Sequence, residues 1–133
     1  MSRYIIPGSP MPLARARQGN SRAYDEQRFL KIGLRDMLST QHGSQPLFPG
    51  PIILSVSFFF PLRPYLLHPK QTEQRLKIIN SPHFSRPDLS YLVRFIEELC
   101  IGITYQDNCA IYSIIASKTF SDNPRTEIDI CQY

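Results

Sequence analysis

The stretch RPDLSYLVRFIEELCIGITYQDNCAI, residues 86–111, contains the pattern that constrains the fold most strongly. Pro87 and Asp88 precede a run in which apolar residues recur at spacings of three and four, as on the buried face of a helix. Those residues are Leu89, Leu92, Val93, Ile96, Leu99 and Cys100. Gly102 follows the run and predicts its end. A second aspartate, Asp107, then precedes an apolar segment, so we expect a helix, a turn and a strand in that order.

The rest of the chain supplies further strands and one more helix. Apolar runs and alternating patterns predict strands at residues 3–6, 51–60, 109–120 and 126–131. A helical pattern begins at Asp25 and is expected to fade before Gly43, while the long basic connection 61–87 has room for a short helix of its own. This order predicts an α/β or α+β domain with a small mixed β-sheet and two main helices. At 133 residues, the chain is expected to form a single domain, 1–133.

Composition excludes several classes of protein. No apolar run reaches 18 residues, so no membrane span is expected, and the apolar run near the N-terminus is too short for a signal peptide. The cysteines lack C-x-x-C spacing and favour buried free thiols in a reducing cytosol; they are Cys100, Cys109 and Cys131. The histidines form no H-E-x-x-H motif and are expected in loops without a catalytic role; they are His42, His68 and His83. Together these features predict a cytoplasmic protein.

Positive charge is concentrated near the N-terminus. The net charge is +4, and the basic residues of the first 31 positions are Arg3, Arg15, Arg17, Arg22, Arg28 and Lys31. Prolines and glycines without periodicity predict a basic arm at about 7–24. Such an arm is suited to follow a phosphate backbone. A solvated surface loop would have the same composition, so charge alone leaves both interpretations open.

Several short motifs follow one another along the chain. They are Gly8-Ser9-Pro10, Arg15-Ala16-Arg17, Tyr24, the run PDLSYLVR at 87–94, Glu98, Gly102, Asp107-Asn108 and Lys118. In this order and spacing the chain resembles the RusA-type Holliday junction resolvases, which are small homodimeric, magnesium-dependent endonucleases of bacteria and phages. The family's motifs are a G-x-P turn, an R-x-R arm ending at a tyrosine, a P-D-L-D-N-L-x-K helix start and a D-D pair. The resemblance covers nearly the whole chain and implies a RusA-like fold.

The resemblance also implies partners and functional residues. It implies branched or structured DNA and a second copy of the chain as partners, Mg²⁺ as cofactor, and a bacterial or phage origin. Metal ligands are implied at or beside Asp88, Ser90, Asp107 and Asn108. Catalytic roles are implied for Asp88, Asp107 and Arg94. We expect DNA contacts from Arg15, Arg17, Arg22, Arg86 and Lys118.

The chain departs from the family pattern at the positions that carry the chemistry. Ser90 and Asn108 stand where carboxylates are expected, and Arg94 stands where a lysine is expected. Magnesium usually takes one or two carboxylates together with waters. A loss of about 1.4 kcal/mol for each missing carboxylate is tenfold in affinity, so two losses should weaken metal binding by at least about a hundredfold. A guanidinium at Arg94 binds phosphate well but cannot readily act as an acid.

Both remaining aspartates have a structural alternative. Asp88 also suits a helix N-cap, and Asp107 also suits a turn before a strand. A helix over 88–100 is about 18 Å long, and the seven residues after it can span about 20 Å, so Asp107 is able to return to Asp88 in one chain. A dimer partner would supply the second carboxylate equally well. The sequence leaves both arrangements open.

Three functions are consistent with these residues. The first is a protein of DNA recombination and repair that binds DNA junctions with lost or reduced endonuclease activity. The second is an active resolvase that recruits Glu98 or another acid. The third is a protein-interaction domain on the same fold, which would use exposed apolar loop residues such as Tyr65, Leu66 and Leu67. The basic arm beside a depleted carboxylate set favours the first.

Overall fold

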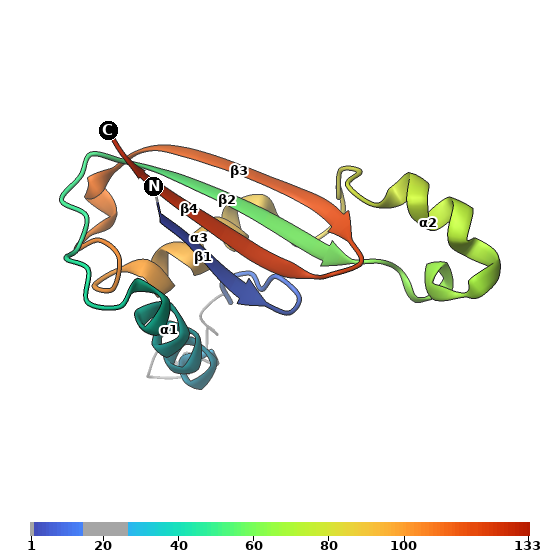
Figure 1. Ribbon diagram of the computed structural model, residues 1–133, viewed down its shortest axis with the longest axis horizontal. Helices are drawn as coiled ribbons and strands as arrows, with labels where there is room; N and C mark the ends of the chain where they lie inside the picture. The colour runs from blue at the N-terminus through green and yellow to red at the C-terminus, as the bar shows by residue number, and fades with distance from the viewer. Residues whose placement is uncertain (1, 15–26) are drawn as a thin grey trace, which may run out of the picture.

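A four-stranded mixed sheet forms the centre of the molecule. The structure, a computed structural model, describes residues 2–14 and 27–133. The strands are β1 (Ser2–Pro7), β2 (Ile52–Pro61), β3 (Ile111–Ser121) and β4 (Arg125–Gln132). They lie in the order β1-β4-β2-β3 (Figure 1). Strand β4 is antiparallel to β1 and β2, whereas β2 and β3 are parallel. The predicted mixed sheet is therefore confirmed.

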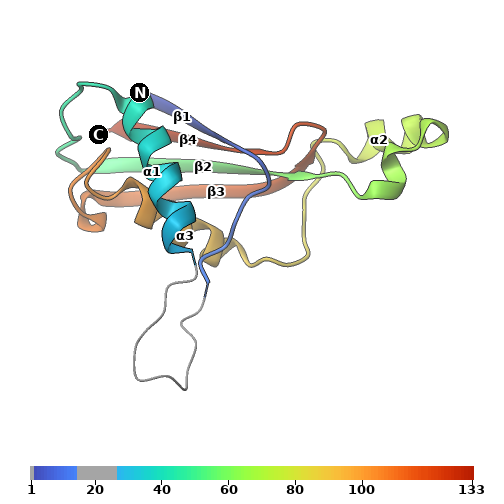
Figure 2. The same cartoon turned by 90° about the horizontal axis from the view of Figure 1, so that it is seen from below.

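The α-helices of the described residues are α1 (Arg28–His42), α2 (Thr72–Ile78) and α3 (Leu89–Cys100). Of these, α1 and α3 cover one face of the sheet. Figure 2 shows α1 and α3 side by side across the same face, and their buried side chains meet the sheet there. Strand β2 turns alternate residues toward them, so Leu54, Val56 and Phe58 are buried. The predicted apolar faces of β2 and α3 are confirmed.

Salt bridging and hydrogen bonding join the two large helices. Lys31 Nζ lies 2.6 Å from Glu98 Oε2, and Arg35 Nη1 donates to the carbonyl oxygens of Glu98 and Leu99 at 2.9 and 3.2 Å. These contacts fix the C-terminal end of α3 against α1. The predicted helix at Asp25 begins at Arg28 instead, and Asp25 and Glu26 lie outside the described residues.

The connection from β2 to α3 contains a lobe, which we define as residues 62–86. It contains two short 3-10 helices, η1 (Pro64–Leu67) and η2 (Pro69–Gln71), and then α2. Figure 1 shows α2 extending beyond the end of β2, away from α1 and α3. The expected short helix is therefore confirmed. The expected exposure of Leu66 is wrong, because this side chain is only 1% exposed, whereas Tyr65 and Leu67 are exposed.

Two local expectations are corrected at the start of β3 and at the thiols. Strand β3 begins at Ile111, two residues later than predicted, because Asn108–Ala110 form a 3-10 turn, η3, in front of it. All three cysteines are free, but only Cys100 is buried, since Cys109 is exposed and Cys131 is half-buried. Burial raises the pKa of the Cys100 thiol to about 12. Within residues 2–14 and 27–133, the helices are too short or too polar to cross a membrane.

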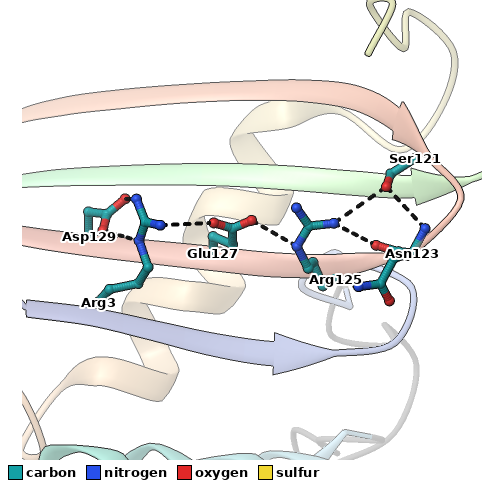
Figure 3. Close-up of polar contacts among 6 residues, drawn as sticks. All are labelled: Arg3, Ser121, Asn123, Arg125, Glu127 and Asp129. Atoms are coloured by element: carbon teal, nitrogen blue, oxygen red, sulfur yellow. Dashed lines mark hydrogen bonds and ion pairs between the residues drawn. The ribbon is translucent and has the colours of Figure 1, made fainter. Parts of the chain in front are cut away.

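A row of ion pairs crosses the sheet face opposite the helices. Arg3 Nε lies 2.9 Å from Asp129 Oδ1, and Arg3 Nη1 lies 3.6 Å from Glu127 Oε1. Arg125 Nε approaches the other Glu127 oxygen at 2.8 Å, and Arg125 also donates to Ser121 Oγ (Figure 3). The charges of Arg3 and Arg125 are thus neutralised by acidic neighbours on the same sheet.

A buried hydrogen bond connects β1 with α1. His42 lies at the end of α1 rather than in a loop, and its ring is buried. Its Nε2 atom lies 3.2 Å from the carbonyl oxygen of Pro46, which can only accept a hydrogen bond, so Nε2 carries the proton. The Nδ1 atom of the neutral ring therefore accepts from the Tyr4 hydroxyl at 2.6 Å. The outer edge of β1 is also bound to α1, because the Gln41 side chain accepts from Ile5 N and donates to Ile5 O.

Replacing Tyr4 with phenylalanine should destabilise the protein by about 1–3 kcal/mol, because the buried Nδ1 of His42 loses its partner. The free energy of unfolding in urea measures this loss. Tyr112→Phe removes a hydroxyl from an exposed ring and should change that free energy by less than about 0.5 kcal/mol. Equal effects of the two substitutions would contradict the role assigned to this bond.

Candidate functional site

Asp88 occupies the N-cap position of α3 but does not cap it with its side chain. Its backbone is extended, and its carbonyl oxygen accepts from the N–H groups of Tyr91 and Leu92 at 3.2 and 3.3 Å. Within the described residues, its carboxylate makes no capping hydrogen bond, and the side chain is exposed. The carboxylate therefore remains available to a cation or to water, although the position is the one a capping residue would occupy.

A hollow of about 410 Å³ opens beside Asp88. We name it the Asp88 hollow; its lining residues are Pro12, Leu13, Arg86, Pro87, Asp88 and Tyr91. The N-terminal segment joins it directly, since Leu13 N donates to Tyr91 O at 2.9 Å. Ala14 N donates to Gln27 Oε1, and Gln27 Nε2 donates to Pro12 O, at 2.9 and 2.8 Å. Both flanks of residues 15–26 are therefore anchored at this hollow.

Lys118 fixes the backbone that leads into Asp88. Its ammonium donates to the carbonyl oxygens of Ser85 and Pro87, each at 2.8 Å. An ammonium has three donors, so one more is available for a phosphate oxygen. Arg86 lies between the two bonded carbonyls and is exposed at the edge of the Asp88 hollow. The structure thus brings three of the expected site residues together: Asp88, Arg86 and Lys118.

Ser90 and Arg94 lie on a different side of α3, over a groove toward β3. The groove has a volume of about 450 Å³ and is lined by Leu89, Ser90, Val93, Arg94, Glu97, Ile114 and Ala116. Glu97, which the sequence pattern did not single out, also lines this groove. Its spacing of seven residues from Ser90 places it on the same helix face, which is the signal that sequence reasoning missed. Burial raises the pKa of Glu97, and Arg94 opposes that effect.

Glu98 points toward α1 rather than toward this groove. Its carboxylate pairs with the Lys31 ammonium at 2.6 Å. The expectation that Glu98 could replace a missing metal ligand therefore has no geometric support within one chain. Glu97 is the acid that borders the groove together with Ser90 and Arg94.

Asp107 and Asn108 are engaged in local hydrogen bonds. Asp107 Oδ1 accepts from Cys109 N at 2.8 Å, which caps η3 and holds the pKa of the exposed Asp107 carboxyl below its usual value. Asn108 Oδ1 accepts from the hydroxyl of the buried Tyr105 at 3.1 Å. Burial also raises the pKa of that phenol, which favours its role as a donor. In one chain, Asp107 therefore acts as a turn residue in front of β3.

A single chain does not bring Asp107 to Asp88. Asp107 lines a separate hollow with Leu47, Phe48, Pro49, Gln106, Cys109 and Ala110. The two aspartates lie near opposite ends of α3, whose 12 residues span about 18 Å. Magnesium holds its oxygen ligands at about 2.0–2.1 Å, so one ion cannot contact both carboxylates within one chain. In the described part of the chain, groups of three or more His, Cys, Asp or Glu side chains close enough to hold a metal are absent.

The expected DNA-binding set lies only partly within the described residues. Arg15, Arg17 and Arg22, together with Tyr24 of the family motif, lie outside the described residues. Arg86 and Lys118 are described, and both lie at the start of α3.

Comparison with known proteins identifies the family. The family model described as "Endodeoxyribonuclease RusA" matches residues 7–131. One curated relative is the "Uncharacterized protein YqaN" of Bacillus subtilis (strain 168), which is 20% identical over 94 residues, or 71% of this chain. The chain spans 66% of that relative's length, just under two thirds. Since the family match covers nearly the whole chain and the expected mixed α+β fold is present, the protein belongs to the RusA endodeoxyribonuclease family.

Proposed function

We propose that the protein binds branched DNA as a homodimer and that its metal-dependent cleavage is lost or strongly reduced. One observation carries the proposal: Asp88 shares a hollow with Arg86, Lys118 bonds the backbone on either side of Arg86, and the described residues that line this hollow include no second acid. Groups that bind phosphate are retained at this place, whereas groups that bind a metal are depleted.

The basic groups support DNA binding. Arg86 is exposed at the Asp88 hollow, and Lys118 keeps one donor free beside it. Ala14 and Gln27, which flank residues 15–26 in the sequence, are hydrogen-bonded to each other, and residues 15–26 contain three arginines. Basic side chains that neutralise phosphates release condensed counterions, which gives sequence-independent affinity for DNA.

The shortage of charged metal ligands supports reduced cleavage. Ser90 supplies no charge, and the amide oxygen of Asn108 already accepts from Tyr105. Asp88 alone would leave a hard divalent cation with one protein carboxylate, at the lower limit of what magnesium sites use. Asp107 would add a second one only if it came from another chain. The residues present in one chain therefore do not fit a complete magnesium site.

The edge strand β3 is the surface that supports dimerisation. It lies at the edge of the sheet, and its exposed apolar side chains are Tyr112, Ile114 and Ile115. An exposed apolar edge strand is a template for pairing with another chain. It also borders the groove of Ser90 and Glu97, so a partner docked there would approach that groove.

An active resolvase is the second candidate, and the position of Glu97 favours it. Glu97 faces the same groove as Ser90 and Arg94, where a family carboxylate is missing. In a dimer, Glu97 or Asp107 of one chain would then complete a metal site with acids of the other. Cleavage assays separate this candidate from the first.

Arg86→Ala should weaken binding to a synthetic four-way junction and lower the magnitude of the salt slope by about one, because one phosphate contact is lost. Fluorescence anisotropy titrations between about 50 and 200 mM salt measure both quantities. Arg3→Ala is the matched control, since it removes one positive charge that is already paired with Asp129 and Glu127. Equal effects of the two variants would contradict a local contact at Arg86, and a parent protein that binds no DNA at all would favour the protein-interaction domain.

The double variant Ser90→Asp, Asn108→Asp should gain junction cleavage in Mg²⁺ or Mn²⁺, because it restores two anionic ligands. The parent should nick the junction slowly or not at all, and its affinity for magnesium by calorimetry should be at least about a hundredfold below that of the double variant. Asp88→Asn in the restored background should abolish the gain. Brisk, symmetric nicking by the parent would overturn the proposal of reduced activity and establish the second candidate.

Ile115→Lys should weaken self-association, because it places a charge on the exposed apolar edge strand. Sedimentation equilibrium should show the dissociation constant of the dimer rising by at least about tenfold. Phe29→Lys changes an exposed apolar residue on α1 and should leave self-association unchanged. A parent that is monomeric at all concentrations would contradict the homodimer.

A further inference from the structure

We propose that the lobe, residues 62–86, is a second DNA-binding element that stacks an unpaired base of branched DNA against Phe84 and Tyr65. The proposal rests on the proposed binding of branched DNA and adds to it a surface and a mode of recognition. It concerns residues outside the metal site and is independent of whether cleavage survives.

The charge of the lobe is the first observation. It contains five basic residues, Arg63, Lys70, Arg75, Lys77 and Arg86, and one acidic residue, Glu73. Its net charge of +4 equals the net charge of the whole chain, so the other residues together are neutral. Arg75 is used internally, since it donates to Leu66 O and Thr72 Oγ1 at 2.9 and 3.1 Å. The other four basic side chains are exposed and face solvent.

Exposed aromatic rings lie among these charges. Phe84 is 93% exposed and Tyr65 is 56% exposed, although both rings are large and apolar enough to favour burial. They line one cavity, which we name the aromatic cup, together with Arg63, Leu66, Ile78, Ser81, Pro82 and Phe120. Its volume of about 220 Å³ is below the usual range for small-molecule sites. A cup of this size suits a planar ring rather than a larger ligand.

Aromatic rings between cations are the chemistry that binds single-stranded nucleic acid. Bases stack on aromatic side chains without regard to sequence, and basic side chains follow the backbone. A base inside an intact duplex is already stacked on its neighbours, so the aromatic cup would gain little from duplex DNA. The branch point of a junction offers bases whose stacking is interrupted. Charge complementarity therefore favours DNA over an apolar protein segment as the occupant.

The aromatic cup is fixed against the sheet rather than attached through a free loop. Asn80 N donates to Phe120 O at 2.8 Å, and His83 N donates to Lys118 O at 3.0 Å. The His83 ring stacks on Phe60, with centroids 4.1 Å apart and planes 15° apart. These contacts hold the returning part of the lobe in one position beside the end of β3, so the cup is preorganised for a ligand.

The aromatic cup also lies close to the Asp88 hollow. Phe84 and Asp88 are four positions apart in the sequence, so their Cα atoms are at most about 14 Å apart. Arg86 lies between them, and Lys118 binds the carbonyls on either side of Arg86. A nucleotide stacked on Phe84 would therefore place its neighbouring phosphates near the basic groups of the hollow.

Phe84→Ala in the full-length protein tests the proposal directly. Its affinity for a four-way junction and for a single-stranded oligothymidine should fall by about tenfold or more, which is the effect expected from losing one base-stacking contact. Affinity for a blunt duplex of equal length should change by less than about twofold. Phe84→Tyr keeps the ring and should retain parent affinity. Leu76→Ala is the matched control, because Leu76 is also an exposed apolar side chain of the lobe but does not line the aromatic cup.

A junction that carries 2-aminopurine at the branch point gives a second readout. Its fluorescence should be quenched on binding the parent and Phe84→Tyr, and quenched less on binding Phe84→Ala at saturating protein. The double variant Lys70→Ala, Lys77→Ala should weaken binding to every DNA form and lower the magnitude of the salt slope by about two.

The outcomes separate this proposal from the proposed function. If the parent binds junctions in preference to duplex while Phe84→Ala and Leu76→Ala behave like the parent, the aromatic cup has no role in DNA binding and the junction-binding function stands. If the parent binds no DNA, both proposals fall, and the exposed rings of the lobe belong to a protein partner instead.

Discussion

The parallel pairing of β2 with β3 is the constraint on which the rest of the structure depends. Parallel neighbours cannot be joined by a tight turn, so the chain must cross over between them. Residues 62–110 make this crossover and contain the lobe, α3 and the turn that carries Asp107. Because α3 returns along the sheet, the crossover puts Asp88 near the far end of β3 and Asp107 just before its start. The separation of the two aspartates thus follows from strand topology.

Lys118 connects the two proposed functional regions through one side chain. It lies on β3, its carbonyl accepts from His83 of the lobe, and its ammonium holds the carbonyls of Ser85 and Pro87. Hydrogen bonds from a charged donor are stronger than neutral ones, so a single lysine can order this whole segment. The ammonium together with burial also lowers the pKa of His83, with burial as the larger cause. A neutral ring is the form that stacks between Phe60 and Phe120 without a buried charge.

Periodic patterns predicted most of the fold, and local side-chain competition explains where they failed. The alternation of apolar residues in β2 and their three-and-four spacing in α3 were sufficient to predict both elements, because each buries one face against the same core. The start of β3 was placed two residues early, since the apolar run from Cys109 gives no sign that the Asp107 side chain binds Cys109 N and forms a turn first. Leu66 was expected to be exposed because a short 3-10 helix has no readable periodicity.

The candidate site was predictable in its residues but not in its geometry. The position of Asp88 at a helix start follows from sequence, because proline, aspartate and an apolar stripe occur in order. The distance between Asp88 and Asp107 does not follow from sequence, since the length of the intervening chain allowed Asp107 to return to Asp88. The return is prevented by the turn after α3, where Gly102 N bonds Tyr105 O and Phe48 pairs with Tyr105. Likewise, sequence did not distinguish the roles of Glu97 and Glu98, because these depend on which face of α3 meets α1, and the contact between Lys31 and Glu98 shows that face.

Binding and cleavage place separate electrostatic demands on this surface. A basic side chain attracts phosphate through a charge that the protein carries itself, whereas a cleavage site first has to gather enough negative charge to hold a dication. Under the proposed function, an uncharged Ser90 or Asn108 in place of a carboxylate would weaken metal binding and would also lessen repulsion of the DNA backbone. Under the proposed function, the depleted acidic set and the basic lobe act in the same direction, because each would favour binding of DNA over binding of magnesium.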